Sequence, residues 1–188
     1  STALLPVVPI IEQNKVILFS GSATNAKITQ AGDYIFRNIP SDAFQGKFAA
    51  EFAFNTLKAR KVAVEYANEE YSVGLKDVFV QRFAELGGQV VTTNSHDRGA
   101  TDVRTQIAKI KNSNPDMIYL ASFPADGATF LKQAKETGLN TTVLGSEVLE
   151  DQQVIEIAQD AANGLLFTRP KQLTSQQFKD SYKARFGI

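Results

Sequence analysis

The sequence of 188 residues contains no cysteine and a single histidine. The absence of cysteine excludes disulfide bonds, thiolate chemistry and cysteine-ligated zinc sites. The one histidine, His96, stands between Ser95 and Asp97 in a polar stretch with no evident nucleophile to activate, so we expect a solvated surface residue. No group of carboxylates has the spacing of a calcium loop. We therefore predict neither a cofactor nor a metal site.

An excess of charge of one sign is also missing. Twenty basic and twenty acidic residues cancel, which argues against nucleic acid or an anionic membrane as a partner. No apolar stretch approaches the roughly 20 residues that cross a bilayer. The chain does not start with the basic and apolar segments of a secretory signal, which a mature exported chain would have lost. Hydrophobic residues make up 43% of the sequence, which suffices for a buried core.

Sequence motifs of several enzyme classes are absent too. The segment Gln45-Gly46-Lys47 lacks the preceding loop of a phosphate-binding P-loop, and Gly21-Ser22-Ala23-Thr24 does not match the G-x-S-x-G nucleophile elbow. No G-x-G-x-x-G follows an apolar run, so a dinucleotide site has no support. We therefore do not expect an enzyme.

What the sequence does contain is one repeated unit between Lys61 and Pro170: a short apolar run, a polar loop and an amphipathic helix. This alternation predicts an α/β fold with a doubly wound parallel sheet, covered by helices on both faces. The predicted strands are Val62–Tyr66, Val90–Thr92, Met117–Ala121, Thr142–Leu144 and Leu165–Thr168. Such sheets bind ligands outside the carboxyl ends of their strands. The residues of functional interest are therefore those that follow the runs, namely 68–71, 122–126 and 146–147.

The helix that precedes the first of these strands should begin at Asp42, which we expect to act as its N-cap. Phe44, Phe48 and Phe52 recur every four residues along it, and this spacing predicts a continuous buried stripe. The first helix of the repeat should end at Gly87-Gly88, because a left-handed C-terminal cap requires glycine.

The two ends of the chain do not complete a second unit of the same kind. The elements predicted there are a helix over 1–13, a strand over 16–19, a strand or extended crossover over 34–39, and a last helix over 176–186. So few elements cannot bury their apolar faces by themselves. We expect a partial first lobe over 1–40, a complete second α/β lobe over 41–168, and a crossover and helix returning to the first lobe over 169–188. Most of the first lobe would then lie outside this chain.

Several segments, taken in order along essentially the whole chain, resemble the periplasmic Leu/Ile/Val-binding proteins. These are the substrate-binding components of branched-chain amino-acid ABC transporters. The segments include Phe19-Ser20-Gly21-Ser22-Ala23-Thr24-Asn25, Ser41-Asp42-Ala43-Phe44-Gln45-Gly46, Glu70-Tyr71-Ser72-Val73-Gly74-Leu75 and Gly145-Ser146-Glu147. The resemblance implies a type I periplasmic binding fold with two lobes joined by three crossovers. It also implies an amino-acid ligand, an ABC permease as partner, a monomer, and a place in the periplasm or at a lipid anchor on the outer face of the cytoplasmic membrane.

The resemblance further implies seven ligand-binding positions. Four match loop positions that hold the ligand carboxylate through hydroxyls and backbone N–H groups; these are Ser1, Ser22, Ala23 and Thr24. Tyr71 matches an aromatic residue that lies over the ligand from the opposite lobe, and Glu147 matches the acid that pairs with the ligand's α-ammonium group. Phe123 stands where relatives often carry tyrosine, so one hydroxyl is lost. Asp42, at the first crossover, is predicted to be a hinge residue or to support the residues that touch the ligand.

Elementary chemistry agrees with this arrangement, because a zwitterion needs donors at one end and an anion at the other. Simpler interpretations stay open at this point. Glu147 could serve only as a first-turn acid that favours a helix dipole, Ser22 and Thr24 could be ordinary turn residues, and Tyr71 could pack on the edge of the sheet. For the whole protein, the alternatives are a ligand-binding sensory domain of the same fold or a flavodoxin-like enzyme.

Overall fold

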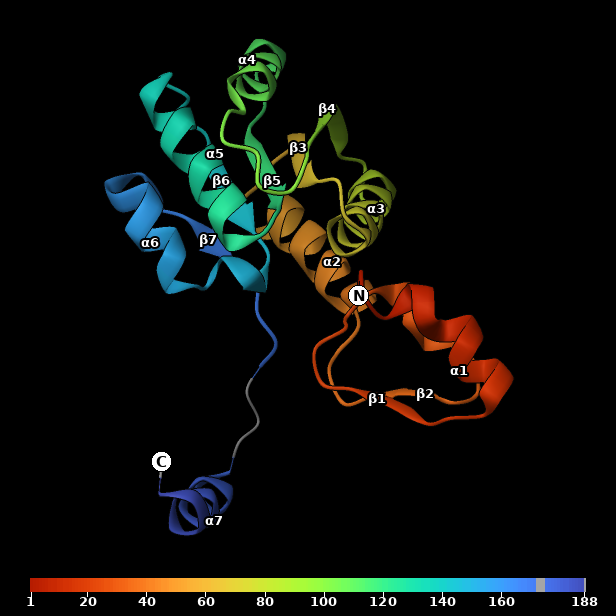
Figure 1. Ribbon diagram of the computed structural model, residues 1–188. Coiled ribbons are helices and arrows are strands. Elements are labelled where there is room, and N and C mark those ends of the chain that lie inside the picture. Colours follow the sequence, from red (N-terminus) through yellow and green to blue (C-terminus); the bar gives the residue numbers. More distant parts are fainter. Residues whose placement is uncertain (172–174, 188) are drawn as a thin grey trace.

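The computed structural model describes residues 1–171 and 175–187. Its larger part is a five-stranded parallel sheet in the order β4-β3-β5-β6-β7, with helices between successive strands (Figure 1). The strands are β3 (Lys61–Ala67), β4 (Gln89–His96), β5 (Met117–Ala121), β6 (Thr142–Gly145) and β7 (Leu166–Phe167). The helices that connect them are α3 (Glu70–Glu85), α4 (Arg104–Ser113), α5 (Pro124–Glu136) and α6 (Gln152–Ala158). The prediction of a doubly wound α/β sheet is confirmed.

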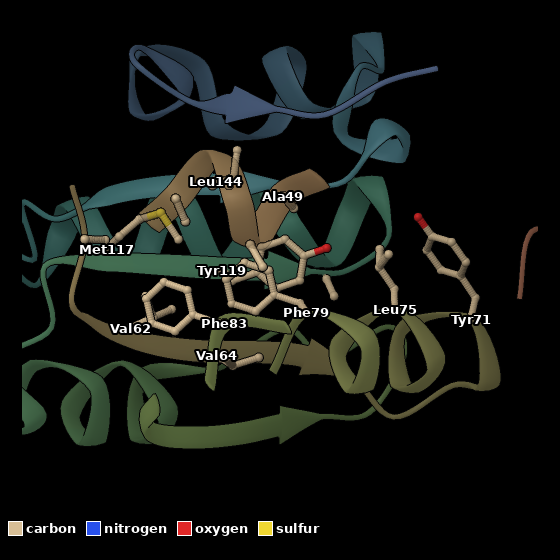
Figure 2. Packing of buried hydrophobic residues seen from close by; sticks show 14 residues of the cluster. Ala49, Val62, Val64, Tyr71, Leu75, Phe79, Phe83, Met117, Tyr119 and Leu144 are labelled. Carbon is tan, nitrogen blue, oxygen red and sulfur yellow. The ribbon is translucent and has the colours of Figure 1, made fainter. Parts of the chain in front are cut away.

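Each face of this sheet has its own core, because side chains alternate along the buried strands. Val64 of β3 and Tyr119 of β5 face α2 (Asp42–Glu51) and α3, whereas Ile118 and Leu120 of β5 face α4, α5 and α6. Figure 2 shows the first core, in which the ring of Phe79 stacks on Tyr119 with 3.8 Å between centroids. All five residues of β5 are buried, as expected for a central parallel strand.

The predicted phenylalanine stripe on α2 is wrong. Phe44 and Phe48 are 74% and 59% exposed. The face that packs carries small residues instead: Ala49 and Ala50 are fully buried, and a Cβ added at Gly46 would lie 2.8 Å from a side-chain carbon of Val78 in α3. Helices with small residues at the contact can approach one another closely, so α2 lies against α3 on this face and presents its phenylalanines outward.

The helix also starts differently from the prediction. Ser41 is the N-cap, with its Oγ accepting from the backbone N–H of Ala43 at 3.2 Å. Asp42 is the first helical residue and is completely buried. The next predicted helix end is confirmed, because α3 stops at Glu85 and Gly87 takes a left-handed φ of 89°.

The N-terminal part of the chain forms a second, small sheet. Its parallel strands are β1 (Leu18–Ser20) and β2 (Ile35–Arg37), accompanied by η1 (Leu5–Val7), α1 (Val8–Asn14) and η2 (Ala26–Gln30). The core of this part holds only four buried apolar residues, and Phe19 remains exposed. Three hydrogen bonds tie it to the larger part: Asn25 Nδ2 donates to the Glu70 carbonyl at 2.6 Å, Lys27 Nζ donates to Glu70 Oε2 at 3.2 Å, and the Asp42 N–H donates to the Thr24 carbonyl at 2.8 Å.

The remaining elements are short or peripheral. They are η3 (Phe52–Thr56), η4 (Glu147–Leu149), η5 (Gln159–Ala162) and α7 (Gln176–Phe186), of which α7 has the predicted bounds. All residues of α7 are exposed, and in Figure 1 the helix lies away from both sheets. Positions 172–174 and 188 of the segment predicted to return to the first lobe lie outside the described residues. Within those residues, the search for a helix capable of crossing a membrane finds none.

Candidate functional site

A cavity of about 220 Å³ lies where the loop after β1 meets the start of α3 and the loops after β5 and β6. It therefore lies outside the carboxyl ends of the strands, where a parallel sheet binds its ligands. Its lining comprises Ser1, Thr2, Ala3, Ser22, Thr24, Tyr71, Arg98, Phe123, Glu147 and Val148. Six of the seven predicted site residues thus surround one cavity. The seventh, Ala23, is buried between Ser22 and Thr24 and does not line it.

Glu147 is the fixed anion of this cavity. It is half-buried at the start of η4, and its Oε2 accepts a hydrogen bond from the Tyr71 hydroxyl at 2.9 Å. The Gln45 side-chain amide donates to the same oxygen, and to Thr168 Oγ1 at 2.9 Å. Two donors from α3 and α2 thus hold the carboxylate at the cavity. Glu147 does occupy a first-turn position, that of η4, and it also lines the cavity.

The predicted carboxylate-binding loop lies at the same cavity. Its backbone N–H groups already have an internal partner, because those of Ser22 and Ala23 point to Ser20 Oγ at 3.4 and 3.0 Å. The hydroxyl of Ser1 accepts from the Asn25 N–H at 3.0 Å, which ties the first residue to the loop. A carboxylate bound here would share these N–H groups with Ser20 or take its place, and would also meet the exposed Ser22 side chain.

Aromatic rings form one wall of the cavity. Tyr71 and Phe123 lie 5.7 Å apart between centroids, and the Arg98 guanidinium lies 4.2 Å from the centre of the Phe123 ring. Arg98 and Gln45 were missed by the sequence reasoning. Arg98 stands two residues beyond the end of β4, so its position after a strand was the signal that could have identified it. Gln45 gave no such signal, because its role depends on how α2 docks.

Asp42 is fully buried and does not line this cavity, but its backbone N–H donates at 2.8 Å to the carbonyl of Thr24, which does. Burial raises the pKa of its carboxyl from 3.8 to about 7, and the charge of Glu147 acts in the same direction. The Thr24 hydroxyl and Arg37 oppose that rise and lower the pKa of Asp42 in part. Burial likewise raises the pKa of Tyr71 and of Tyr119, and Glu147 adds to both. The amine end predicted for the ligand therefore holds two carboxyl groups, of which Asp42 is fully buried and Glu147 half-buried.

The prediction that His96 is a solvated surface residue is wrong. His96 is 4% exposed, and its Nδ1 lies 2.7 Å from Glu65 Oε1 while its Nε2 lies 3.1 Å from Ser122 Oγ. The polar neighbours in sequence misled the prediction: β4 extends to His96, so strand alternation turns this side chain inward against β3 and β5. Ser122 is fully buried, so the network fixes the end of β5 just before Phe123 and presents no nucleophile to the cavity.

Among residues 1–171 and 175–187, no group of three or more His, Cys, Asp or Glu side chains has an arrangement suited to a metal ion.

One family model and two curated proteins illustrate what this chain is similar to. The family model described as "Periplasmic binding protein" matches residues 1–188. The leucine-specific-binding protein of Salmonella typhimurium is 29% identical over 172 residues, which are 91% of this chain and 47% of that protein. The leucine-, isoleucine-, valine-, threonine- and alanine-binding protein of Pseudomonas aeruginosa is 27% identical over 190 residues, 98% of this chain and 51% of that protein. The chain thus spans about half the length of the curated relatives it matches.

Solved structures agree on the fold. A leucine-binding protein from Thermotoga maritima has a TM-score of 0.84 and 32% identity, with 98% of this chain and 54% of that chain covered. The branched-chain amino acid transporter substrate-binding protein of Streptococcus pneumoniae, solved with isoleucine, has a TM-score of 0.81 at 24% identity, with 99% and 55% covered. The second likeness shows the fold alone.

Proposed function

Because the chain belongs to the periplasmic binding protein family, whose model it matches from end to end, we propose that it is part of a solute-binding protein and not an enzyme. The proposed solute is a small amino acid with a branched or apolar side chain, captured for uptake by an ABC transporter. The relatives that bind leucine and other branched-chain amino acids support this choice of ligand.

The observation that carries the proposal is the presence of unlike groups around one cavity. Glu147 and the hydroxyl-bearing residues Ser1, Ser22 and Thr24 all line it. We propose that the ligand's ammonium group binds Glu147, and that its carboxylate binds the Ser22–Thr24 loop, including the Ala23 N–H. An ammonium–carboxylate pair shielded from water contributes strongly to binding, because loss of one partner costs about 3–5 kcal/mol.

The aromatic wall accounts for the apolar part of the ligand. The rings of Tyr71 and Phe123 would cover an aliphatic side chain, as apolar surfaces do in most small-molecule sites. The Tyr71 hydroxyl is already bonded to Glu147, so its ring is held in one orientation. Since Phe123 has no hydroxyl, it adds apolar cover and no further contact to the amine.

We further propose that residues 1–40 belong to one lobe, 41–168 to a second, and 169–188 to a crossover and helix that return to the first. The presence of two separate sheets supports this division. Closure about the connections near 39–42 and 168–171 would bury the ligand, and the closed form would be what the permease recognises. We place the protein, as a monomer, in the periplasm or at a lipid anchor on the outer face of the cytoplasmic membrane.

A thermal-shift screen of the chain against the common amino acids tests the proposal. A ligand that binds the folded state alone raises the melting temperature, and even weak binding becomes visible at about 10 mM ligand. We expect leucine, isoleucine or valine to stabilise the chain, and Glu147→Gln to abolish this effect. The matched control is Glu156→Gln, the same change at an exposed position of α6, which should behave as the wild type. Absence of stabilisation by every amino acid would refute the proposed function.

A further inference from the structure

Asp42 is a buried acid to which no cation of the described residues is bonded. In the part of the chain that the structure describes, neither of its carboxylate oxygens has a hydrogen-bond partner. Buried polar side chains are ordinarily bonded, so an exception of this kind needs an explanation. The position itself is well fixed, because the Asp42 N–H donates to the Thr24 carbonyl at 2.8 Å and the residue opens the first turn of α2. The unpaired carboxyl is therefore a built feature of the fold.

The groups around Asp42 come from several elements and do not neutralise it. Glu147 of η4 raises its pKa, while Arg37 of β2, the Thr24 hydroxyl and the terminal ammonium of Ser1 lower it. The Arg37 guanidinium is bonded elsewhere: it donates to the carbonyls of Thr24 and Asn25 at 3.0 and 2.9 Å, and also to a threonine hydroxyl.

The rest of the surroundings of Asp42 is uncharged or acidic. Tyr71 of α3 and Tyr119 of β5 both sense its charge, because a negative Asp42 raises their pKa values. Gln45, one turn further along α2, donates its amide to Glu147. The fully buried Asp42 and the half-buried Glu147 thus influence each other, with no cation bonded to either among the described residues.

We infer that Asp42 is a specificity-determining residue of the amine end: in the empty site it is protonated in about half of the molecules at neutral pH, and it releases that proton to solvent when a ligand ammonium binds beside Glu147. The inference rests on the proposed function. An ammonium close to both acids favours the ionised form of each, and only the O–H bond of Asp42 breaks in this exchange. A ligand that lacks the amine brings no positive charge and obtains no such gain. Asp42 would therefore discriminate amino acids from plain carboxylic acids.

The pKa of Asp42 fixes the size of the effect. A group with a pKa of about 7 is half protonated at neutral pH, so binding at pH 7 should release about half a proton per ligand. At pH 6 the ligand must expel about nine-tenths of a proton, whereas at pH 8 it expels about one-tenth. The affinity should consequently fall about tenfold between pH 8 and pH 6.

The test is isothermal titration calorimetry of the full chain with L-leucine at pH 6, 7 and 8. At pH 7 the titration is repeated in phosphate and in Tris, which differ in ionisation enthalpy and so report the number of protons released. We expect the tenfold fall in affinity and a heat that depends on the buffer. Asp42→Asn should remove both, whereas Asp77→Asn, at an exposed position of α3, should retain both. 4-Methylpentanoate, which is leucine without its amine, should release no proton.

The outcomes separate this inference from the proposed function. If no amino acid binds the wild type, the proposed function fails and the inference fails with it. If leucine binds with the same heat in both buffers and the same affinity at pH 6 and 8, Asp42 is merely structural and only the inference fails. Should Asp42→Asn not fold, the carboxyl carbon of Asp42 can be followed by NMR in the wild type. A titration midpoint near 7 that leucine does not lower would overturn the inference.

Discussion

The burial of Asp42 leads to a stability prediction that needs no ligand. The pKa of this carboxyl is about 7 in the folded chain against 3.8 in the reference state. This difference corresponds to about 4 kcal/mol between its protonated and ionised forms. Between these two pH values the folded state binds more protons than the unfolded state, so rising pH removes stability across this window. Above about pH 8 the full penalty is present, and below about pH 4 none of it is.

Replacement of Asp42 by asparagine removes the charge while preserving shape and hydrogen-bonding groups. Urea denaturation of the wild type and of Asp42→Asn, followed by circular dichroism between pH 4 and pH 8, gives the difference in unfolding free energy at each pH. We expect that difference to grow in favour of the variant by up to about 4 kcal/mol over this range. Other titrating groups cancel in the comparison because both proteins share them.

The same series with Asp77→Asn provides the matched control, since Asp77 is 62% exposed in its side chain and a pH dependence common to both variants would not come from burial. A flat difference for Asp42→Asn would refute the reasoning. It would mean that the carboxyl ionises in the folded chain as easily as in water.

Three further predictions address the site and the cores. Glu147→Gln should weaken leucine binding, measured by calorimetry, on the order of a hundredfold and leave the circular dichroism spectrum unchanged. The reason is that the amide keeps the bonds to Tyr71 and Gln45 but turns an N–H₂ group toward the ligand ammonium. An affinity within threefold of wild type would remove Glu147 from the site. His96→Ala should lower the unfolding free energy, measured in urea, by about 3–5 kcal/mol, since it leaves the Glu65 carboxyl group buried without its partner. A loss under about 1 kcal/mol would show that Glu65 gains a different hydrogen-bond partner in the variant. Phe48→Ala should change stability by less than about 0.5 kcal/mol, whereas Phe79→Ala, in the core of the sheet, should cost about 3–5 kcal/mol; equal losses would mean that the outward face of α2 is covered in solution.

The sheet could be predicted from the sequence because its evidence is local and repeated. Each strand is an apolar run between loops, and the parallel order follows from the helices between them. The same logic led to the cavity, since residues after successive strands gather at one edge. Glu147 and Phe123 both belong to this class. Their assignment as ligand-binding residues remains a prediction, although the structure does bring them to one cavity.

The errors share a different origin, because each depends on which face of an element meets its neighbour. Phe44 and Phe48 have the spacing of a buried stripe, yet Gly46 and Ala49 offer α2 a closer approach to α3. His96 has polar neighbours in sequence, yet the strand continues to it and carries it inward. Amphipathic spacing indicates that two faces of a helix differ in character, but tertiary packing decides which face is buried. The partners of a buried polar group likewise depend on the tertiary structure. The sequence therefore could not distinguish Asp42 from an ordinary residue at the start of a helix.

Asp42 connects the stability of the empty chain to the selectivity proposed for its site. The fold keeps a carboxyl whose ionisation is disfavoured by about 4 kcal/mol, as follows from a pKa near 7. A ligand ammonium that restored this pKa to 3.8 would recover the whole of that free energy, which corresponds to about a thousandfold in affinity at pH 8. A ligand without an amine would recover none. The free energy by which ionisation of Asp42 is disfavoured therefore limits both measurements. The stability that Asp42→Asn gains at pH 8 is the most that ionisation of Asp42 can contribute to the binding of an amine. If the variant gains only about 1 kcal/mol, the preference for an amine cannot exceed about fivefold through Asp42, and Glu147 must supply the rest.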